Sequence, residues 1–287
     1  MKNEDLYPAL EKSTHVDCIK GEIYLTDCPA DIPFWNYPHK NDAIITCICK
    51  KGKLMGQINL QPVHAEGPGL LVILPDQIVQ FEKPSEDFQG VFIIMSKQFK
   101  EKISLSEGVS TFLAIRDAPF VPFINKRVLE GLMDYYRMVR KVLHNTKNDF
   151  NKKAVIKHLT IAFFYGVGYY LHELTGKDKK TRTEIIVEDF LKLVQKHYKQ
   201  QRNLEFYAGQ LCMTTKHLSS SVKSSTGKSA RQWVDDYVIL EAKSLLKSTD
   251  MSVQQISDEL NFPSQSFFGK YFKREVGASP KQYRLGI

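Results

Sequence analysis

Five cysteines and eight histidines are the side chains most able to do chemistry, and their spacing argues against most of it. Metal sites need such ligands at short, regular spacings, and the histidines form no HxH or HxxxH pair. Cys47-Ile48-Cys49 is not a zinc spacing; it alternates along an apolar run, which would place both sulfurs on one face of a strand. We therefore expect buried, structural thiols, and neither a metal site nor a cofactor.

The length of 287 residues suggests about two domains. With 43% hydrophobic and 25% charged residues, the composition is that of a globular protein rather than a disordered one. No apolar stretch reaches about 18 residues, so no membrane-spanning helix is expected. The first residues lack the apolar core of a signal peptide, and the cysteine count is odd; together these predict reduced thiols in a cytoplasmic protein.

The net charge of +8 is unevenly distributed. It is −4 over residues 1–125, +7 over 126–181 and +5 over 182–287, which sum to +8. An acidic N-terminal part joined to a basic remainder is typical of a protein that meets nucleic acid at one end only. Charge by itself does not choose between nucleic acid and another acidic surface, because both attract a basic protein.

Short apolar runs separated by turn residues fill the N-terminal third. They predict strands that would form a small sandwich or barrel, with five runs at Ala43–Cys49, Lys53–Leu60, Leu70–Leu74, Ile78–Phe81 and Phe88–Met95. A barrel can hold a small molecule among its inward side chains. The candidate ligand-binding residues are Phe34, Trp35, His39 and Phe92. The alternative is that these aromatic residues only fill the core.

Two helices are predicted next, over Asn125–Leu143 and Phe150–Leu174, because apolar residues recur there at helical spacing. A short polar turn joins them into a helical hairpin. Its apolar surface could form a dimer seam or could simply pack on the barrel. A charged stretch beginning at Gly176 reads as a linker. The expected domains are a barrel over 1–124, a hairpin over 125–175, a linker over 176–182 and a helical domain over 183–287.

The last hundred residues contain an internal duplication. Leu204–Leu211 and Thr215–Thr226 predict a helix, a tight turn and a second helix that ends at Gly227; Val253–Leu260 and Ser264–Val276 repeat this pattern and end at Gly277. A long helix over Ala230–Lys247 bridges the two copies. Two helix-turn-helix units joined by one helix are a specific arrangement.

At these residues the sequence resembles the AraC/XylS family of bacterial transcription regulators. The stretches that carry the resemblance are Lys223–Gly227 (KSSTG), Leu240–Leu246 (LEAKSLL), Val253–Phe262 (VQQISDELNF) and Ser264–Arg284 (SQSFFGKYFKREVGASPKQYR). The N-terminal part is similar to the cupin-like sensor barrel that many members carry. The resemblance implies an α+β multidomain chain, with a small cupin-like β-barrel, a helical hairpin and an all-α domain of two helix-turn-helix units.

The resemblance also implies which side chains meet DNA. The second helix of each unit would enter the major groove. Base-facing positions fall on Lys216, Ser219 and Ser220 in unit one and on Gln265, Ser266 and Lys270 in unit two. Phosphate contacts are expected from His217, Lys223, Lys273 and Arg274, whereas Leu218, Val222, Phe268 and Phe272 should be core. Tyr207 and Tyr271 are expected to be packing groups.

This sequence departs from the family pattern at three places. The turn glycines are replaced by Cys212 and Asn261, and because cysteine adopts the left-handed conformation poorly, the first turn is expected to bend differently. Position 220, often arginine in the family, is serine, so unit one is expected to discriminate bases less than unit two. A family arginine in the bridging helix falls on Val238, and its role cannot be transferred.

The leading functional prediction is a sequence-specific DNA-binding regulator with no enzymatic activity. The resemblance implies a homodimer, activation through contact with RNA polymerase, and control by a small-molecule effector in the barrel. A metal-dependent cupin oxygenase or isomerase is the alternative, although only His39 and His64 lie near the predicted strands. A scaffold with a vestigial DNA-binding fold is a third possibility.

Overall fold

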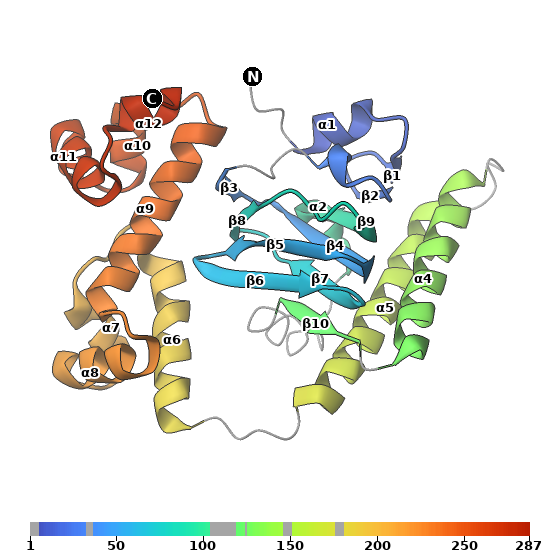
Figure 1. Ribbon diagram of the computed structural model, residues 1–287, viewed down its shortest axis with the longest axis horizontal. Coiled ribbons are helices and arrows are strands. Elements are labelled where there is room, and N and C mark those ends of the chain that lie inside the picture. The colour runs from blue at the N-terminus through green and yellow to red at the C-terminus, as the bar shows by residue number, and fades with distance from the viewer. Residues whose placement is uncertain (1–5, 33–36, 104–118, 124, 146–150, 176–180) are drawn as a thin grey trace. The chain divides into compact units, whose positions relative to one another are not determined.

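The computed structural model describes residues 6–32, 37–103, 119–123, 125–145, 151–175 and 181–287 (Figure 1). Most of the linker expected over 176–182 therefore lies outside the described residues, as do Phe34 and Trp35. The contacts between residues divide the chain into two compact units, Met1–Lys177 and Asp178–Ile287. Among the described residues, no helix is both long and apolar enough to cross a membrane.

The first unit is built on two antiparallel sheets. The six-stranded sheet has the order β1-β2-β9-β4-β7-β10 and the four-stranded sheet the order β3-β8-β5-β6. The strands are β1 (Asp17–Ile19), β2 (Ile23–Thr26), β3 (His39–Lys40), β4 (Ala43–Lys51), β5 (Lys53–Ile58), β6 (Gln61–Glu66), β7 (Gly69–Ile73), β8 (Ile78–Phe81), β9 (Gln89–Ser96) and β10 (Phe120–Pro122). The five strands predicted from apolar runs are confirmed, with ends shifted by no more than two residues.

Both faces of the six-stranded sheet are buried, because side chains alternate along each strand. On β4, Ala43, Ile45 and Cys47 point into the core shared with the four-stranded sheet, whereas Ile44 and Ile48 join a second core under the helices. This explains why β4 reads as a continuous apolar run rather than an alternating one. Cys47 and Cys49 are buried on one face, as predicted, and burial raises the pKa of the Cys49 thiol to about 11.

The predicted hairpin is formed by α4 (Lys126–His144) and α5 (Lys152–Thr175), and its inner face packs on the six-stranded sheet. Val139 of α4 and Phe164 of α5 are fully buried in this second core. Arg140 donates to Asp17 at 2.6 Å and Lys153 donates to Glu22 at 2.8 Å. These two contacts join both helices to the β1–β2 hairpin. The unit also contains α1 (Leu6–Lys12), a 3-10 turn over Pro29–Asp31 and α2 (Lys97–Ile103).

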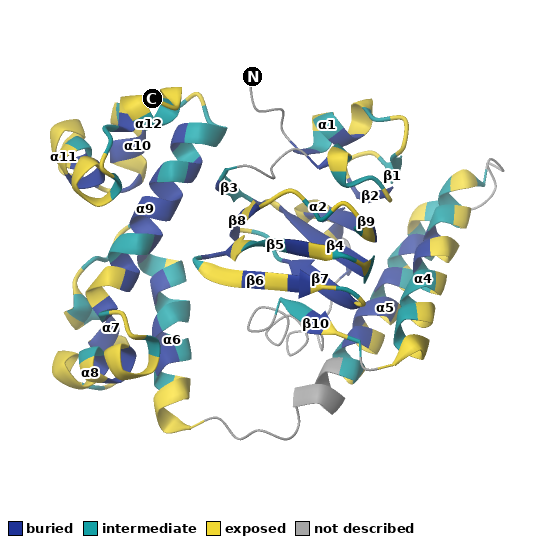
Figure 2. Ribbon diagram, in the orientation of Figure 1, coloured by how far each residue is buried: buried dark blue, intermediate teal, exposed yellow. Residues whose placement is uncertain are grey.

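The second unit is entirely helical in the part that the structure describes. Its helices are α6 (Arg182–His197), α7 (Leu204–Gln210), α8 (Thr215–Thr226), α9 (Ala230–Ser248), α10 (Val253–Glu259), α11 (Gln265–Val276) and α12 (Pro280–Leu285). The bridging helix α9 supplies much of the core, and Figure 2 shows it largely buried. Ser252 caps α10 by accepting a hydrogen bond from the Gln255 amide at 3.1 Å, as its sequence position predicted.

Candidate nucleic-acid interface

Two helix-turn-helix units lie on either side of α9 in the sequence, as predicted: α7 and α8 form unit one, and α10 and α11 form unit two. The first helices are 49 residues apart and the second helices 50, because Pro263 lengthens the second turn by one residue (253 − 204 and 265 − 215). Thr214 and Ser264 cap α8 and α11 by accepting from the third helical amide at 3.2 Å. Both helices end on a left-handed glycine, with φ of 74° at Gly227 and 84° at Gly277.

Cys212 and Asn261 adopt the same left-handed conformation, so the expectation that Cys212 bends the first turn differently is wrong. Cys212 has a φ of 52° and Asn261 a φ of 53°. The Cys212 amide donates to the Gly209 carbonyl at 3.1 Å, and the Asn261 amide donates to the Asp258 carbonyl at 2.9 Å. The turn's own hydrogen bonds thus impose the left-handed conformation on a residue that disfavours it.

Replacing Cys212 by glycine should therefore stabilise the helical domain, residues 178–287, by about 1 kcal/mol, because glycine adopts the left-handed conformation without the steric cost. Replacing Asn261 by glycine should change stability by only a few tenths of a kcal/mol, since asparagine tolerates the left-handed region. Urea unfolding measured for the two variants in parallel checks the difference. Equal changes in stability at both positions would show that the left-handed conformation costs Cys212 no more free energy than it costs Asn261.

The inward sides of α8 and α11 form the core, as predicted. Leu218, Val222, Phe268 and Phe272 are all fully buried. Tyr207 and Tyr271 are buried as well, and the Tyr271 hydroxyl donates to Asp235 at 3.0 Å. Because these side chains face inward, the opposite faces of α8 and α11 are left for solvent or a ligand.

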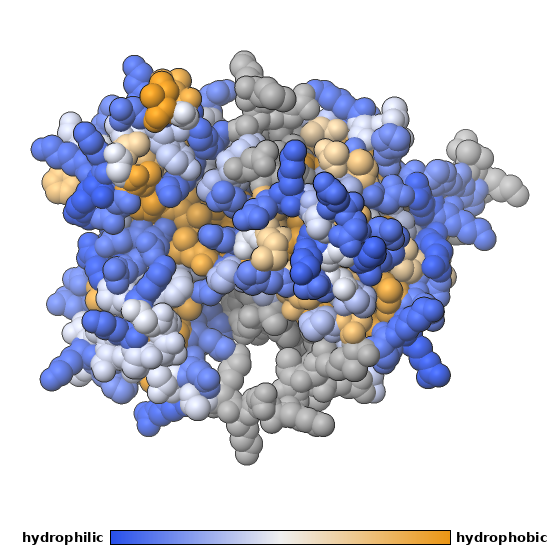
Figure 3. Space-filling model, viewed as in Figure 1, coloured by the Kyte–Doolittle hydropathy of each residue, from blue (hydrophilic) through white to orange (hydrophobic). Residues whose placement is uncertain are grey.

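The outward faces carry the predicted contact residues. All of these are exposed except Ser219, which is half-buried; the set is Lys216, His217, Ser219, Ser220, Lys223, Gln265, Ser266, Lys270, Lys273 and Arg274. The four lysines form no ion pair within the described chain, whereas the Arg274 guanidinium donates to Glu275 at 2.6 Å. In Figure 3, mainly hydrophilic residues cover α11 and paler, near-neutral residues cover the serine-rich α8.

Phe267 is an outward residue that the sequence reasoning missed. Its side chain is 63% exposed, one residue before the fully buried Phe268 and 50 residues after His217. Adjacent helical residues cannot share a face, so a pair of phenylalanines at the start of a recognition helix was the available signal. An exposed phenylalanine on such a helix can contact the methyl group of thymine.

Polar contacts join the residues that follow α6 to α9 and to helix-turn-helix unit two. The Arg202 guanidinium lies 3.9 Å from the centre of the Phe262 ring and donates to the carbonyls of Leu260 and Asn261 in the second turn. The Lys199 ammonium lies 3.1 Å from Glu241 of α9 and also contacts Glu259 of α10. Two residues that follow α6, Lys199 and Arg202, therefore contact unit two directly.

In the N-terminal compact unit, Met1–Lys177, the described candidate ligand residues are His39 and Phe92. His39 is half-buried on β3, opposite Val79. Phe92 is 1% exposed within the core between the two sheets, which is the packing role that the sequence left open. The cavity beside it measures about 10 Å³, enough for roughly one water molecule. Within the described ranges, no three His, Cys, Asp or Glu side chains are placed to hold a metal ion.

The comparisons with known proteins concern the C-terminal helix-turn-helix domain and relate it to transcription regulators. A family model described as a helix-turn-helix domain matches residues 207–286. The HTH-type transcriptional regulator ExsA of Pseudomonas aeruginosa is 32% identical over 100 residues, covering 35% of this chain and 36% of that protein. The arabinose operon regulatory protein of Escherichia coli is 33% identical over 79 residues, covering 28% of this chain and 27% of that protein.

Among solved structures, the C-terminal domain of AraT, a response regulator from Geobacillus stearothermophilus, is 30% identical with a TM-score of 0.35. That match covers 37% of this chain and 89% of the AraT domain. The chain spans only 36% and 27% of the two curated relatives named above, so these likenesses concern the helix-turn-helix domain. Residues 207–286 therefore form a helix-turn-helix domain similar to the domains of these regulators, in agreement with the resemblance to the AraC/XylS family.

Proposed function

We propose that this chain is a sequence-specific DNA-binding transcription regulator. The observation that carries the proposal is the pair of equal helix-turn-helix units, each with a second helix whose outer face is polar and basic. Lys216, Ser219 and Ser220 would read bases in unit one, and Gln265, Ser266 and Lys270 in unit two. His217, Lys223, Lys273 and Arg274 would hold phosphates. Phe267 joins the base-reading set through thymine methyl contact.

The two second helices would occupy successive major grooves, about 34 Å apart along the duplex. One protomer would then cover close to two turns of DNA. We further propose a homodimer formed through the helical hairpin, where Tyr165 of α5 is 46% exposed. The proposal also includes a small-molecule effector that acts on the N-terminal compact unit, and activation of transcription through contact with RNA polymerase. The family resemblance favours both.

Selection of genomic DNA fragments by the purified full-length protein tests this proposal. We expect enrichment of a motif with two short boxes whose centres lie about 10 base pairs apart, because each box is read by one unit. A dimer would produce two copies of that motif in the enriched fragments. Fragments enriched no further than in a protein-free selection would contradict the proposed function, and a single box would contradict the use of both units.

A further inference from the structure

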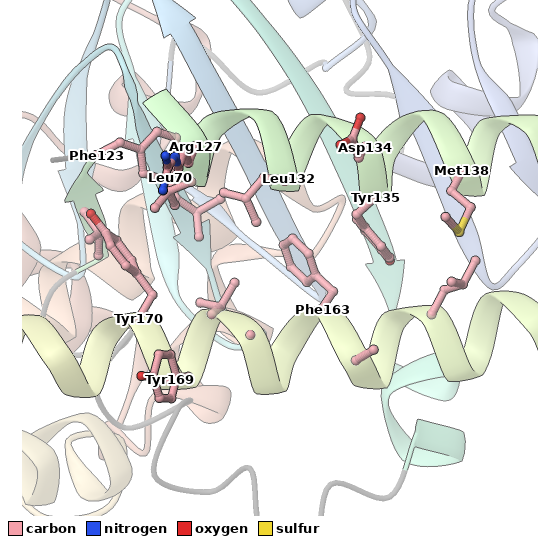
Figure 4. Close-up of a pocket in the computed structure, with 17 residues that line it drawn as sticks. Leu70, Phe123, Arg127, Leu132, Asp134, Tyr135, Met138, Phe163, Tyr169 and Tyr170 are labelled. Atoms are coloured by element: carbon pink, nitrogen blue, oxygen red, sulfur yellow. The ribbon is translucent and has the colours of Figure 1, made fainter. Parts of the chain in front are cut away.

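An open apolar groove runs between the two helices of the hairpin (Figure 4). It measures about 570 Å³, within the size range of small-molecule sites. Leu132 and Tyr135 of α4 and Phe163 of α5 line its length, and Phe123 closes one end beside the six-stranded sheet. The groove is thus far larger than the cavity of about 10 Å³ between the two sheets.

Small residues leave open space in the groove. Gly131 of α4 and Gly166 of α5 line it, together with Ala162, and all three are exposed. A methyl group added at either glycine would meet nothing within 4 Å. Glycine inside a helix is disfavoured relative to alanine, and no packing within the described chain requires it at these two positions. The groove therefore contains space that the chain itself does not use.

One positive charge at the groove is uncompensated. Arg127, in the first turn of α4, lines the end near Phe123 and has no acidic partner among the residues that the structure describes. The nearby carboxylates have partners of their own, because Glu130 lies 3.8 Å from Lys126 and Asp134 pairs with Arg137. From Arg127 to Met138 at the other end, the helical rise gives a groove length of about 16 Å.

The tyrosine hydroxyls that reach the groove already have partners. Tyr135 shares a hydrogen bond of 2.9 Å with Thr160, and Tyr170 donates to the Pro122 carbonyl at 3.4 Å. An occupant therefore meets an apolar trough whose charged lining is the unpaired Arg127 guanidinium at one end and the Asp134 carboxylate, which already pairs with Arg137. The matching chemistry is an apolar body that carries one carboxylate.

We propose that this groove binds a small-molecule carboxylate with an extended apolar body, and that it is the effector site of the protein. The second part rests on the proposed function; the binding itself does not. A second copy of the chain matches the charge of the groove less well, because Glu130 and Asp134, the described carboxylates beside the groove, already pair with Lys126 and Arg137.

Titration calorimetry of the full-length protein with decanoate, below the concentration at which decanoate aggregates, tests the binding. We expect saturable binding of decanoate, binding of decanol at least tenfold weaker, and still weaker binding of decyltrimethylammonium. Arg127→Gln should weaken decanoate binding at least tenfold and leave decanol binding unchanged, because only the carboxylate meets the guanidinium. Equal binding of the anion and the cation, or none of the anion, would overturn the proposal.

Two variants fill the groove without disturbing the fold. Gly131→Leu and Gly166→Leu place a side chain where the structure has open space, so both proteins should keep the wild-type circular dichroism spectrum and melt no lower than the wild type. Decanoate binding should fall at least thirtyfold in each. Gly209→Leu on α7, also open within 4 Å, is the matched control and should bind decanoate normally. Normal binding to a folded Gly166→Leu protein would refute the site.

Sedimentation and DNA binding separate the remaining outcomes. If decanoate fails to bind and Gly166→Leu converts dimers into monomers, the groove is an interface between copies and the proposal fails. If neither leucine variant folds, Ala162→Leu serves as the third filling variant, with the same loss expected. If decanoate binds as expected but the protein selects no DNA, the groove stands as a ligand site and the regulatory function falls.

Discussion

Replacing Gln265 and Lys270 together by alanine should lower the affinity of the full-length protein for its selected DNA site by about 2–4 kcal/mol, or roughly 30- to 1,000-fold. Gln265 can form two hydrogen bonds with adenine, and Lys270 can donate to guanine. Both side chains are exposed on α11, and the Lys270 ammonium has no competing ion pair within the described chain. Fluorescence anisotropy with a labelled site at fixed salt measures the loss.

The paired comparison is Lys216→Ala with Ser220→Ala in unit one, where we expect about 1–2 kcal/mol. The smaller effect follows from Ser220, because its short hydroxyl reaches less far into the major groove of DNA than the Lys270 side chain at the corresponding position. Lys196→Ala on α6 removes one positive charge outside both second helices and serves as the electrostatic control. A larger loss from the unit-one pair than from the unit-two pair would refute the dominance of unit two.

The strands that the sequence predicts are those with apolar residues on both faces or in clear alternation. Strand β6 escapes prediction because Gln61, Pro62, His64 and Glu66 are all exposed, which leaves only Val63 and Ala65 as buried residues. β1, β2 and β3 have no more than four residues each, too few to establish a period. The helices of the hairpin and of the helix-turn-helix units are predicted more fully, since each apolar stripe extends over more than one turn, whereas the short α1, α2 and α12 are missed.

The helix-turn-helix units are visible in the sequence because a duplicated pattern carries more information than any single element. The conformation at Cys212 is not, because local preference opposes it and the hydrogen bonds of the turn decide it. The hairpin groove is also hidden. Gly131 and Gly166 lie 35 residues apart on different helices, and only the packed pair shows that both face one open trough. Arg127 looks like any exposed charge until that trough is seen.

The contact between Lys199 and Glu241 makes the strongest prediction for stability. Glu241 is 1% exposed on α9, where it meets the Lys199 ammonium at 3.1 Å and the Tyr198 hydroxyl. Burial, followed by the charge of Glu241, raises the pKa of Tyr198, so this phenol stays protonated and can donate to the carboxylate. Replacing Glu241 by alanine should cost about 3 kcal/mol, because it leaves part of the positive charge uncompensated.

Glu259 supplies the matched control, because it contacts the same ammonium from α10 but its side chain is 44% exposed. Glu259→Ala should cost less than about 1 kcal/mol, since water screens an exposed pair. Denaturant unfolding in a Trp35→Phe background measures both changes, as Trp233 of α9 is then the only tryptophan. A loss below 1 kcal/mol for Glu241→Ala would mean that Lys199 turns to solvent when its partner is removed.

The same contact bears on DNA recognition, because Lys199 follows α6 while its two partners lie on α9 and α10. Removing Glu241 should loosen unit two relative to unit one, even in the fraction of protein that stays folded. Affinity for a two-box site should then fall while tolerance of altered box spacing rises. Glu241→Gln, which keeps the hydrogen bonds but not the charge, should lose less of both. Unchanged spacing preference in a folded Glu241→Ala protein would show that α9 alone sets the distance between the units.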